Sequence, residues 1–126
     1  MVKKKFNLLN SDPTKVKIGY RDIAIEWVGP DFKTDQLTDN YGEYRAREGK
    51  ILIQDTLCGQ EKVNVFLHEC MHAIVYGSGL NQANGPLKED DAEEIAVNQI
   101  TNYLVGMLRD NPYLFDFIKK NIEKDL

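Results

Sequence analysis

The chain has 126 residues, of which 42% are hydrophobic and 29% are charged, values that are ordinary for one globular domain. Its net charge of −4, with no basic face, disfavours nucleic acid as a main partner, and no apolar run is long enough to span a membrane. Residues 1–6 contain a lysine cluster without the apolar run of a secretory signal, and the two cysteines do not suggest a disulfide framework. We therefore expect a single cytoplasmic domain over residues 1–126.

The first half of the chain has the alternating hydrophobic pattern of β-strands. The segments with this pattern are 16–20, 23–28, 41–46 and 50–54. The last two flank Arg47-Glu48-Gly49, which predicts a hairpin with glycine in its turn. Residues 31–40 are polar, and we expect a loop there. Together these segments predict a small sheet of about three strands.

The second half has helical periodicity. We expect helices from about Gln60 to Tyr76, from Asp90 to Arg109, and after Asn111-Pro112. Gly77 stands where a left-handed glycine ends many helices, and residues 77–86 are expected to form a loop. The expected apolar faces are Val63, Phe66, Leu67, Cys70 and Ile74 in the first helix, Val97, Ile100, Leu104, Met107 and Leu108 in the second, and Leu114, Phe115, Ile118 and Ile122 in the last. A sheet followed by helices predicts an α+β fold in which the first helix is central.

Both histidines of the chain lie in the first predicted helix. His68 and His72 are four residues apart, so they project from one face, and Glu69 directly follows the first of them. This H-E-x-x-H pattern is typical of zinc metallopeptidases, in which the histidines bind the metal and the glutamate is the general base. The helix is apolar nearly all round and is expected to be buried, where these polar groups need partners. We predict one Zn²⁺ ion per chain held by His68 and His72, with Glu69 as the catalytic base.

A catalytic zinc site needs a third protein ligand, and no third histidine is present. Glu93 and Glu94, at the start of the next helix, are the candidates. Asp90 and Glu93 have the spacing of a capping box, which would occupy Glu93, whereas Glu94 precedes Asn98 by four residues, and that amide could orient the site. We predict Glu94 as the ligand and keep Glu93 as the alternative, although either acid could simply favour the helix dipole. Cys58 is a less suitable ligand, because no second cysteine is suitably spaced.

The motif from His68 to His72, followed by Glu94 and Asn98, resembles the gluzincin plan. It is similar, more closely, to the small bacterial and phage metallopeptidases of the ImmA/IrrE type. In that family the glutamate is followed by an Ala-Asn pair, an aromatic and apolar residues, and residues 94–104 fit this outline with valine and isoleucine in place of the alanine and the aromatic. The resemblance covers about residues 41–112. It implies hydrolysis of peptide bonds in a protein substrate, with a phage or mobile-element repressor as an expected target.

Other features of the predicted site stay open. The tyrosines that could supply a further hydrogen bond to the reacting carbonyl, unranked by the sequence, are Tyr41, Tyr44, Tyr76 and Tyr103. A peptide substrate is expected to add as a strand beside Ile51-Leu52-Ile53. The alternative functions are a non-catalytic module stabilised by zinc, against which Glu69 argues, and a nucleic-acid-associated protease of the SprT type, against which the acidic charge argues. The sequence predicts no oligomeric state.

Overall fold

The structure is a computed structural model, and it describes residues 11–29 and 41–123. The expected loop at 31–40 and the lysine cluster at 1–6 lie outside those residues. In the described part, four strands precede three helices, which confirms the α+β class. The elements are β1 (Lys15–Ile18), β2 (Arg21–Val28), β3 (Gly42–Arg45), β4 (Lys50–Gln54), α2 (Gly59–Ser78), α3 (Asp90–Asp110) and α4 (Tyr113–Glu123).

The sheet has four strands in the order β1-β2-β4-β3, one more than the three or so expected from the sequence. β1 joins as a full edge strand because Gly19, with a φ of +66°, lets the chain reverse tightly into β2. The predicted hairpin is present, since β3 and β4 pair antiparallel and Gly49, with a φ of +65°, ends their turn. β2 and β4 run parallel, so the sheet is mixed.

β4 lies inside the sheet, between β2 and β3. The expectation that a substrate strand adds beside Ile51-Leu52-Ile53 is therefore wrong, because both edges of β4 already have partners. β3 is the edge strand on this side. Just before β3, the C=O of Tyr41 accepts a hydrogen bond from the N–H of Gln54, with 2.9 Å between the two atoms. Along an antiparallel pair of strands, residues that bond to the partner strand alternate with residues whose main-chain groups point away from it. The main-chain groups of Gly42 and Tyr44 therefore point away from β4.

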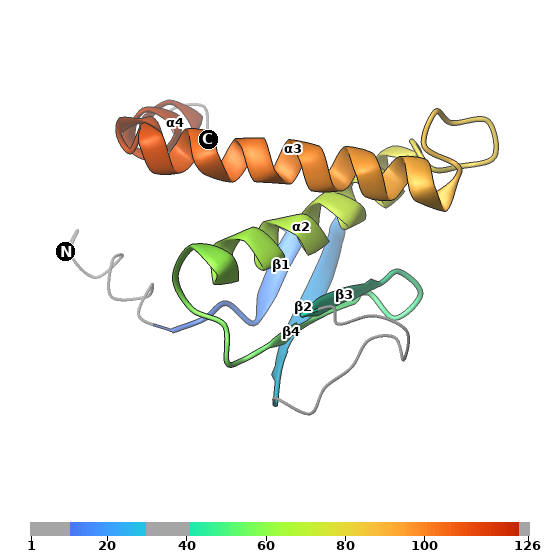
Figure 1. The fold of residues 1–126 in the computed structure, drawn as a ribbon, viewed down its shortest axis with the longest axis horizontal. Helices are drawn as coiled ribbons and strands as arrows, with labels where there is room; N and C mark the ends of the chain where they lie inside the picture. The colour runs from blue at the N-terminus through green and yellow to red at the C-terminus, as the bar shows by residue number, and fades with distance from the viewer. Residues whose placement is uncertain (1–10, 30–40, 124–126) are drawn as a thin grey trace.

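α2 forms the middle layer of the molecule, with the sheet on one side and α3 on the other (Figure 1). Its sheet-facing side chains pack on the apolar face of the two central strands, and this contact is the core. The buried core residues are Ile23, Ile25, Ile51, Ile53, Leu57, Cys70 and Ala73. Because α2 contacts both other layers, polar side chains on its flank can be held between β3 and α3.

The buried faces of α2 and α3 agree only in part with those expected, since Cys70 and Val97 are buried but other predicted positions are exposed. On α2, Val63 and Ile74 remain 47% and 44% exposed, because the helix turns Cys70 and Ala73 towards the sheet and those two residues to its sides. On α3, the predicted face residues Ile100 and Met107 are 55% and 47% exposed. In the described part of the chain, α3 packs mainly against α2, so its buried stripe is narrow and follows a spacing of four residues: Val97, Thr101 and Val105.

α2 continues through Gly77 and ends at Ser78, so the expectation that Gly77 terminates the helix is wrong. The left-handed residue is Gly79, with a φ of +83°. Its N–H donates to the C=O of Tyr76, and the next N–H, that of Leu80, donates to the C=O of Val75 at 3.2 Å. This pair of bonds satisfies the last carbonyls of the helix and fixes where the chain turns towards α3.

α4 begins at Tyr113, so Pro112 immediately precedes the helix, whereas the sequence placed this proline at its first position. None of the residues of α4 is buried. Several of its apolar side chains, including Phe115 and Ile122, are more than half exposed. Among the described residues, no helix has the length and apolar character needed to cross a membrane.

Candidate metal centre

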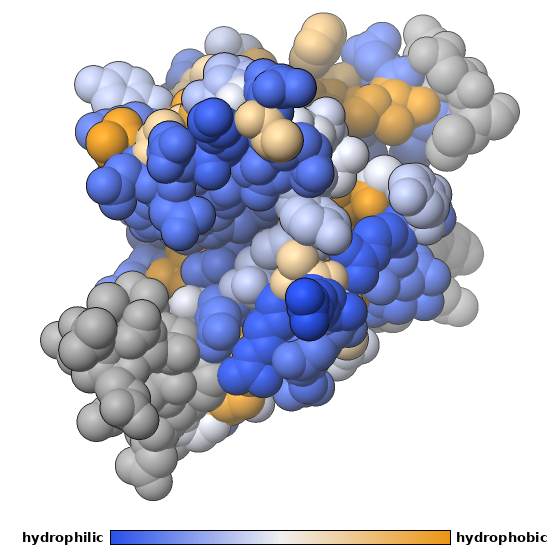
Figure 2. Space-filling view, turned by 90° about the vertical axis from the view of Figure 1, so that its right-hand side faces the viewer, coloured by the Kyte–Doolittle hydropathy of each residue, from blue (hydrophilic) through white to orange (hydrophobic). Residues whose placement is uncertain are grey.

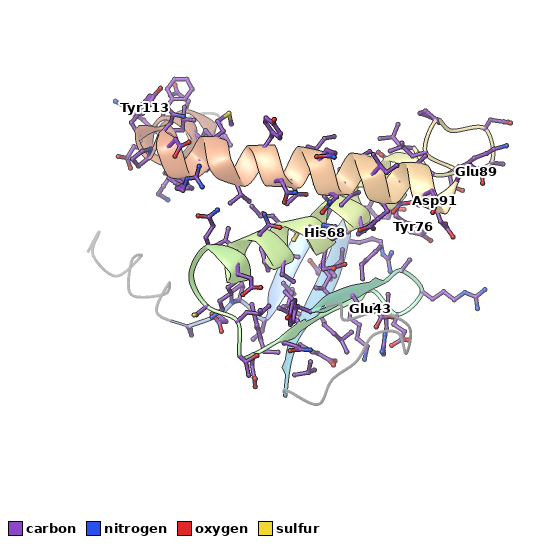
Figure 3. All side chains as sticks on the ribbon, in the orientation of Figure 1. Glu43, His68, Tyr76, Glu89, Asp91 and Tyr113 are labelled. Atoms are coloured by element: carbon purple, nitrogen blue, oxygen red, sulfur yellow. The ribbon has the colours of Figure 1, made fainter. Side chains whose placement is uncertain are left out.

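A cavity of about 720 Å³ lies between β3, one flank of α2 and the start of α3. Figure 2 shows the end of the molecule that carries the β3–β4 turn and the loop before α3. Its surface is mainly hydrophilic, and a recess lies between α3 and the sheet. The side chains of His68 and Tyr76 lie between α3 and the sheet, with Glu43 on the β3 side (Figure 3). All the residues predicted for the metal and the general base line this one cavity.

His68, His72 and Glu94 converge there, with one possible ligand atom from each lying within 4.8 Å of the others. The helical spacing places the two imidazole rings side by side on α2, with 4.9 Å between their centres. Glu94 comes from the first turns of α3 and reaches both rings. Its Oε1 lies 3.0 Å from Nε2 of His72, and its Oε2 lies 3.3 Å from Nε2 of His68.

Glu93 has a different role from the one expected. The N-cap of α3 is Glu89, and no side chain caps this helix, so the predicted capping box of Asp90 and Glu93 is wrong. The Glu93 side chain instead contacts His72, with Oε2 2.6 Å from Nδ1 of that ring. Its other oxygen accepts from Nδ2 of Asn81 at 3.0 Å. Since Glu93 and Glu94 are adjacent, they approach opposite nitrogens of the same ring.

These contacts determine which nitrogen of His72 is available. An ionised carboxylate only accepts hydrogen bonds, so Nδ1 must carry the proton donated to Glu93. In the neutral ring, Nε2 then presents a lone pair to Glu94, which is also an acceptor. Two facing acceptors repel unless a proton or a metal cation lies between them. The contact with Glu93 therefore orients the His72 ring so that Nε2 faces Glu94.

The His68 imidazole is also suited to the neutral ligand form. Burial lowers its pKa, and His72 lowers it further, while the nearby Glu94 carboxylate opposes the shift. A histidine binds metal through its unprotonated nitrogen. The local environment of His68 thus favours the form that can coordinate.

Glu69 lies beside this cluster and is only 6% exposed. Burial raises its pKa to about 7, with Glu94 and Glu43 adding to the rise and His72 opposing it. The main-chain N–H of Tyr44 donates a hydrogen bond to the Glu69 carboxylate. No lysine or arginine forms an ion pair with Glu69 in the part of the chain that the structure describes. A cation bound by the neighbouring ligands would supply the missing positive charge.

Gly42 is what allows β3 to lie so close to Glu69. A Cβ atom at this position would be 2.9 Å from Cγ1 of Val65 and 3.2 Å from the side chain of Glu69. Both of these distances are shorter than ordinary van der Waals contacts. The absence of a side chain at Gly42 therefore lets the Tyr44 N–H reach the carboxylate.

Comparison of the chain with protein-family models, curated proteins and solved structures finds no match. The resemblance to ImmA/IrrE-type peptidases accordingly remains a prediction from the motif.

The other residues considered from the sequence are now placed. Asn98 lines the cavity but makes no hydrogen bond to the described residues, and Asn81 instead supports the cluster through Glu93. Cys58 is the exposed N-cap residue of α2 and lies outside the cluster. Tyr103 is 81% exposed and does not line the cavity, whereas the other three tyrosines do.

Sequence reasoning missed the contacts of Glu93, Asn81 and Gly42. An isolated glycine within a strand commonly marks a close backbone approach, so Gly42 did carry a usable signal. The pairing of Glu93 with His72 had none, because it depends on the angle at which α3 meets α2.

Proposed function

We propose that this chain is a zinc-dependent peptidase that hydrolyses peptide bonds in a protein substrate. The observation that carries the proposal is the convergence of His68, His72 and Glu94 on one point, next to the buried carboxylate of Glu69. Metal ligands and a candidate base thus share one open cavity.

The donor set fits zinc. Two imidazoles and one carboxylate are a common catalytic combination, in which a fourth position stays open for water or substrate. The Glu94 side chain is 58% exposed, so the cluster is open towards the cavity. A purely structural zinc site is usually closed by four protein ligands, and the described residues offer three here. This difference favours the peptidase over the zinc-stabilised module.

When bound, zinc supplies a Lewis acid that acidifies water and polarises a carbonyl group. Glu69 is the group that moves the proton. It removes one proton from water as the water oxygen bonds to the carbonyl carbon, and the C=O π electrons move onto the carbonyl oxygen. When the C=O bond re-forms, the C–N bond breaks and the amine leaves with the proton that Glu69 returns. One water is consumed, and Glu69 is regenerated.

β3 is the strand beside which an extended substrate fits. Among the described residues, no strand pairs with its outer edge, and this edge borders the cavity. Extended peptides commonly bind by adding to such an edge through main-chain hydrogen bonds. The Tyr44 N–H is engaged by Glu69, which leaves the outward-facing main-chain groups of Gly42 and the C=O of Tyr44 for a substrate strand. A strand here would bring a peptide bond near the base. A phage or mobile-element repressor as the substrate rests on the family resemblance alone.

The proposal is tested on protein stripped with a chelator and then titrated with zinc. About one ion per chain should bind and raise the melting temperature, because the assembled site exists only in the folded state. His72→Ala should lose both effects. Stoichiometric, tight zinc binding by His72→Ala would show that the metal site is elsewhere.

Activity is measured as cleavage of a degenerate peptide mixture, followed by mass spectrometry. The zinc-loaded chain should cut peptides, and Glu69→Gln should bind zinc equally well but cut none, because the amide cannot accept the proton. Zinc binding and a higher melting temperature without cleavage by the unmodified chain would favour the zinc-stabilised module.

A further inference from the structure

Among the four tyrosines that the sequence left unranked, Tyr44 is distinguished by an arginine that contacts its hydroxyl group. Nη1 of Arg21 donates to the Tyr44 oxygen at 3.4 Å. The hydroxyl oxygen is therefore engaged as an acceptor, while its own proton has no acceptor among the described residues. Tyr44 also lines the cavity that holds the metal ligands and Glu69. Its hydroxyl is thus a donor without a partner at the edge of the site.

Arg21 is itself held in place from several directions. Its Nη2 donates to the C=O of Ala46 at 3.0 Å, and its guanidinium lies 5.8 Å from the ring centre of Tyr76. The turn before β4 leaves room for it, because a Cβ on Gly49 would be 2.8 Å from Nη2. No carboxylate forms an ion pair with Arg21 in the described residues. Its charge can therefore act on the Tyr44 phenol.

The ring of Tyr44 is fixed as well as its oxygen. It packs edge-on against the ring of Tyr76, with 6.2 Å between the two centres, and it contacts the apolar core. Burial raises the pKa of the Tyr44 phenol, although Arg21 opposes the shift, so the group keeps its proton at neutral pH. By contrast, Tyr41 is 45% exposed, and its hydroxyl group has no hydrogen bond to the described residues. A donor that is already oriented contributes most when charge develops in front of it.

We infer that Tyr44 is a catalytic residue that donates a hydrogen bond to the oxygen of the scissile carbonyl group, and that Arg21 is the residue that positions it. The inference rests on the proposed peptidase function. The main-chain N–H of Tyr44 donates a hydrogen bond to Glu69, the proposed general base, and the Tyr44 side chain lines the same cavity. One residue of the edge strand would therefore hold the base and also donate to the carbonyl oxygen. Arg21 pulls electron density from the phenol oxygen and makes its proton a stronger donor.

The first test compares Tyr44→Phe with the matched variant Tyr103→Phe, whose tyrosine lies outside the cavity. On a peptide cleaved by the zinc-loaded chain, Tyr44→Phe should lower kcat by about 100-fold or more with little change in KM. Tyr103→Phe should match the unmodified chain. If Tyr44→Phe keeps full kcat, or if Tyr41→Phe causes the loss instead, the inference is overturned while the peptidase function stands.

The second test needs no cleavage. Acetohydroxamate binds zinc through a carbonyl oxygen, and its affinity for each zinc-loaded variant is measured by calorimetry. Tyr44→Phe should bind it about fivefold to tenfold more weakly, as expected for one lost hydrogen bond, and Tyr103→Phe should be unchanged. Equal affinities in all variants would contradict the inference. Because this measurement is independent of turnover, it tests the hydrogen bond from Tyr44 separately from the peptidase function.

The third test asks whether Arg21 acts through Tyr44. Arg21→Gln should lower kcat and weaken acetohydroxamate binding less than Tyr44→Phe does, and the double variant should be no worse than Tyr44→Phe alone. Independent, additive losses would show that Arg21 has only a structural role. Melting temperatures of the variants separate these effects from misfolding.

Discussion

The Glu93 carboxylate accepts a hydrogen bond from Nδ1 of His72, with 2.6 Å between the two atoms. This contact joins the first turn of α3 to the middle of α2 at the point where His68, His72 and Glu94 converge. It also explains why two consecutive glutamates occur at this position. Glu94 faces Nε2, where a metal would bind, and Glu93 holds the other nitrogen of the same ring.

The two glutamates should differ in how much zinc affinity they supply. Glu93→Ala should weaken zinc binding by about 10- to 100-fold, because His72 loses the group that orients it. Glu94→Ala should weaken it further, because a ligand is lost outright. Competition with a chelating dye measures both affinities. Glu89→Ala is the matched control, since Glu89 is exposed and contacts neither histidine. A larger loss in Glu93→Ala than in Glu94→Ala would reverse the assignment.

The burial of Glu69 should make the metal-free protein less stable at high pH. Its pKa is about 7 in the folded state against a usual value of 4.5, so the folded state binds more protons between these values. Stability therefore falls as pH rises through this window, by about 3 kcal/mol in all. Glu69→Gln removes this titration, so the variant should gain stability relative to the unmodified chain between pH 5 and pH 8. Denaturant unfolding in the presence of a chelator measures the difference, and parallel pH profiles would contradict the prediction.

Gly42→Ala should disturb the contact between β3 and α2. The added Cβ would lie 2.9 Å from Cγ1 of Val65 and 3.2 Å from Glu69, and overpacking of this kind costs about 1–3 kcal/mol. The stability loss is read from urea unfolding. Gly29→Ala is the control, because nothing lies within 4 Å of the atom it adds, and it should change stability by less than about 0.5 kcal/mol. Equal stability losses in the two variants would contradict the prediction, because they would show that Val65 and Glu69 can move to accommodate a Cβ atom at position 42.

The end of α2 should respond oppositely to the same substitution at two neighbouring glycines. Gly77 lies in the last turn of the helix with open space around it, so Gly77→Ala should stabilise the protein by about 0.5–1 kcal/mol. Gly79 has a φ of +83°, which disfavours a side chain, so Gly79→Ala should destabilise it by about 1 kcal/mol. Thermal unfolding of both variants shows the signs. Destabilisation by Gly77→Ala would place the helix end where the sequence pattern suggested.

Features that depend on neighbouring residues were predictable from the sequence. The four-residue spacing of His68 and His72 places them on one face of any helix, whatever else packs against it. Likewise, the hairpin turn ending at Gly49 and the α+β class follow from local periodicity and turn chemistry. These features follow from backbone geometry over a few residues, which the sequence by itself determines.

Features that depend on how distant segments meet were decided only by the tertiary structure. Glu93 and Glu94 are equivalent candidates until the packing of α3 on α2 turns one towards Nδ1 and the other towards Nε2 of His72. The Tyr44 hydroxyl accepts a hydrogen bond from Arg21 because β2 brings that side chain beside it. β4 became an interior strand because β2 pairs with it in parallel. Contacts of this kind join residues that are more than twenty positions apart, and no local pattern specifies them.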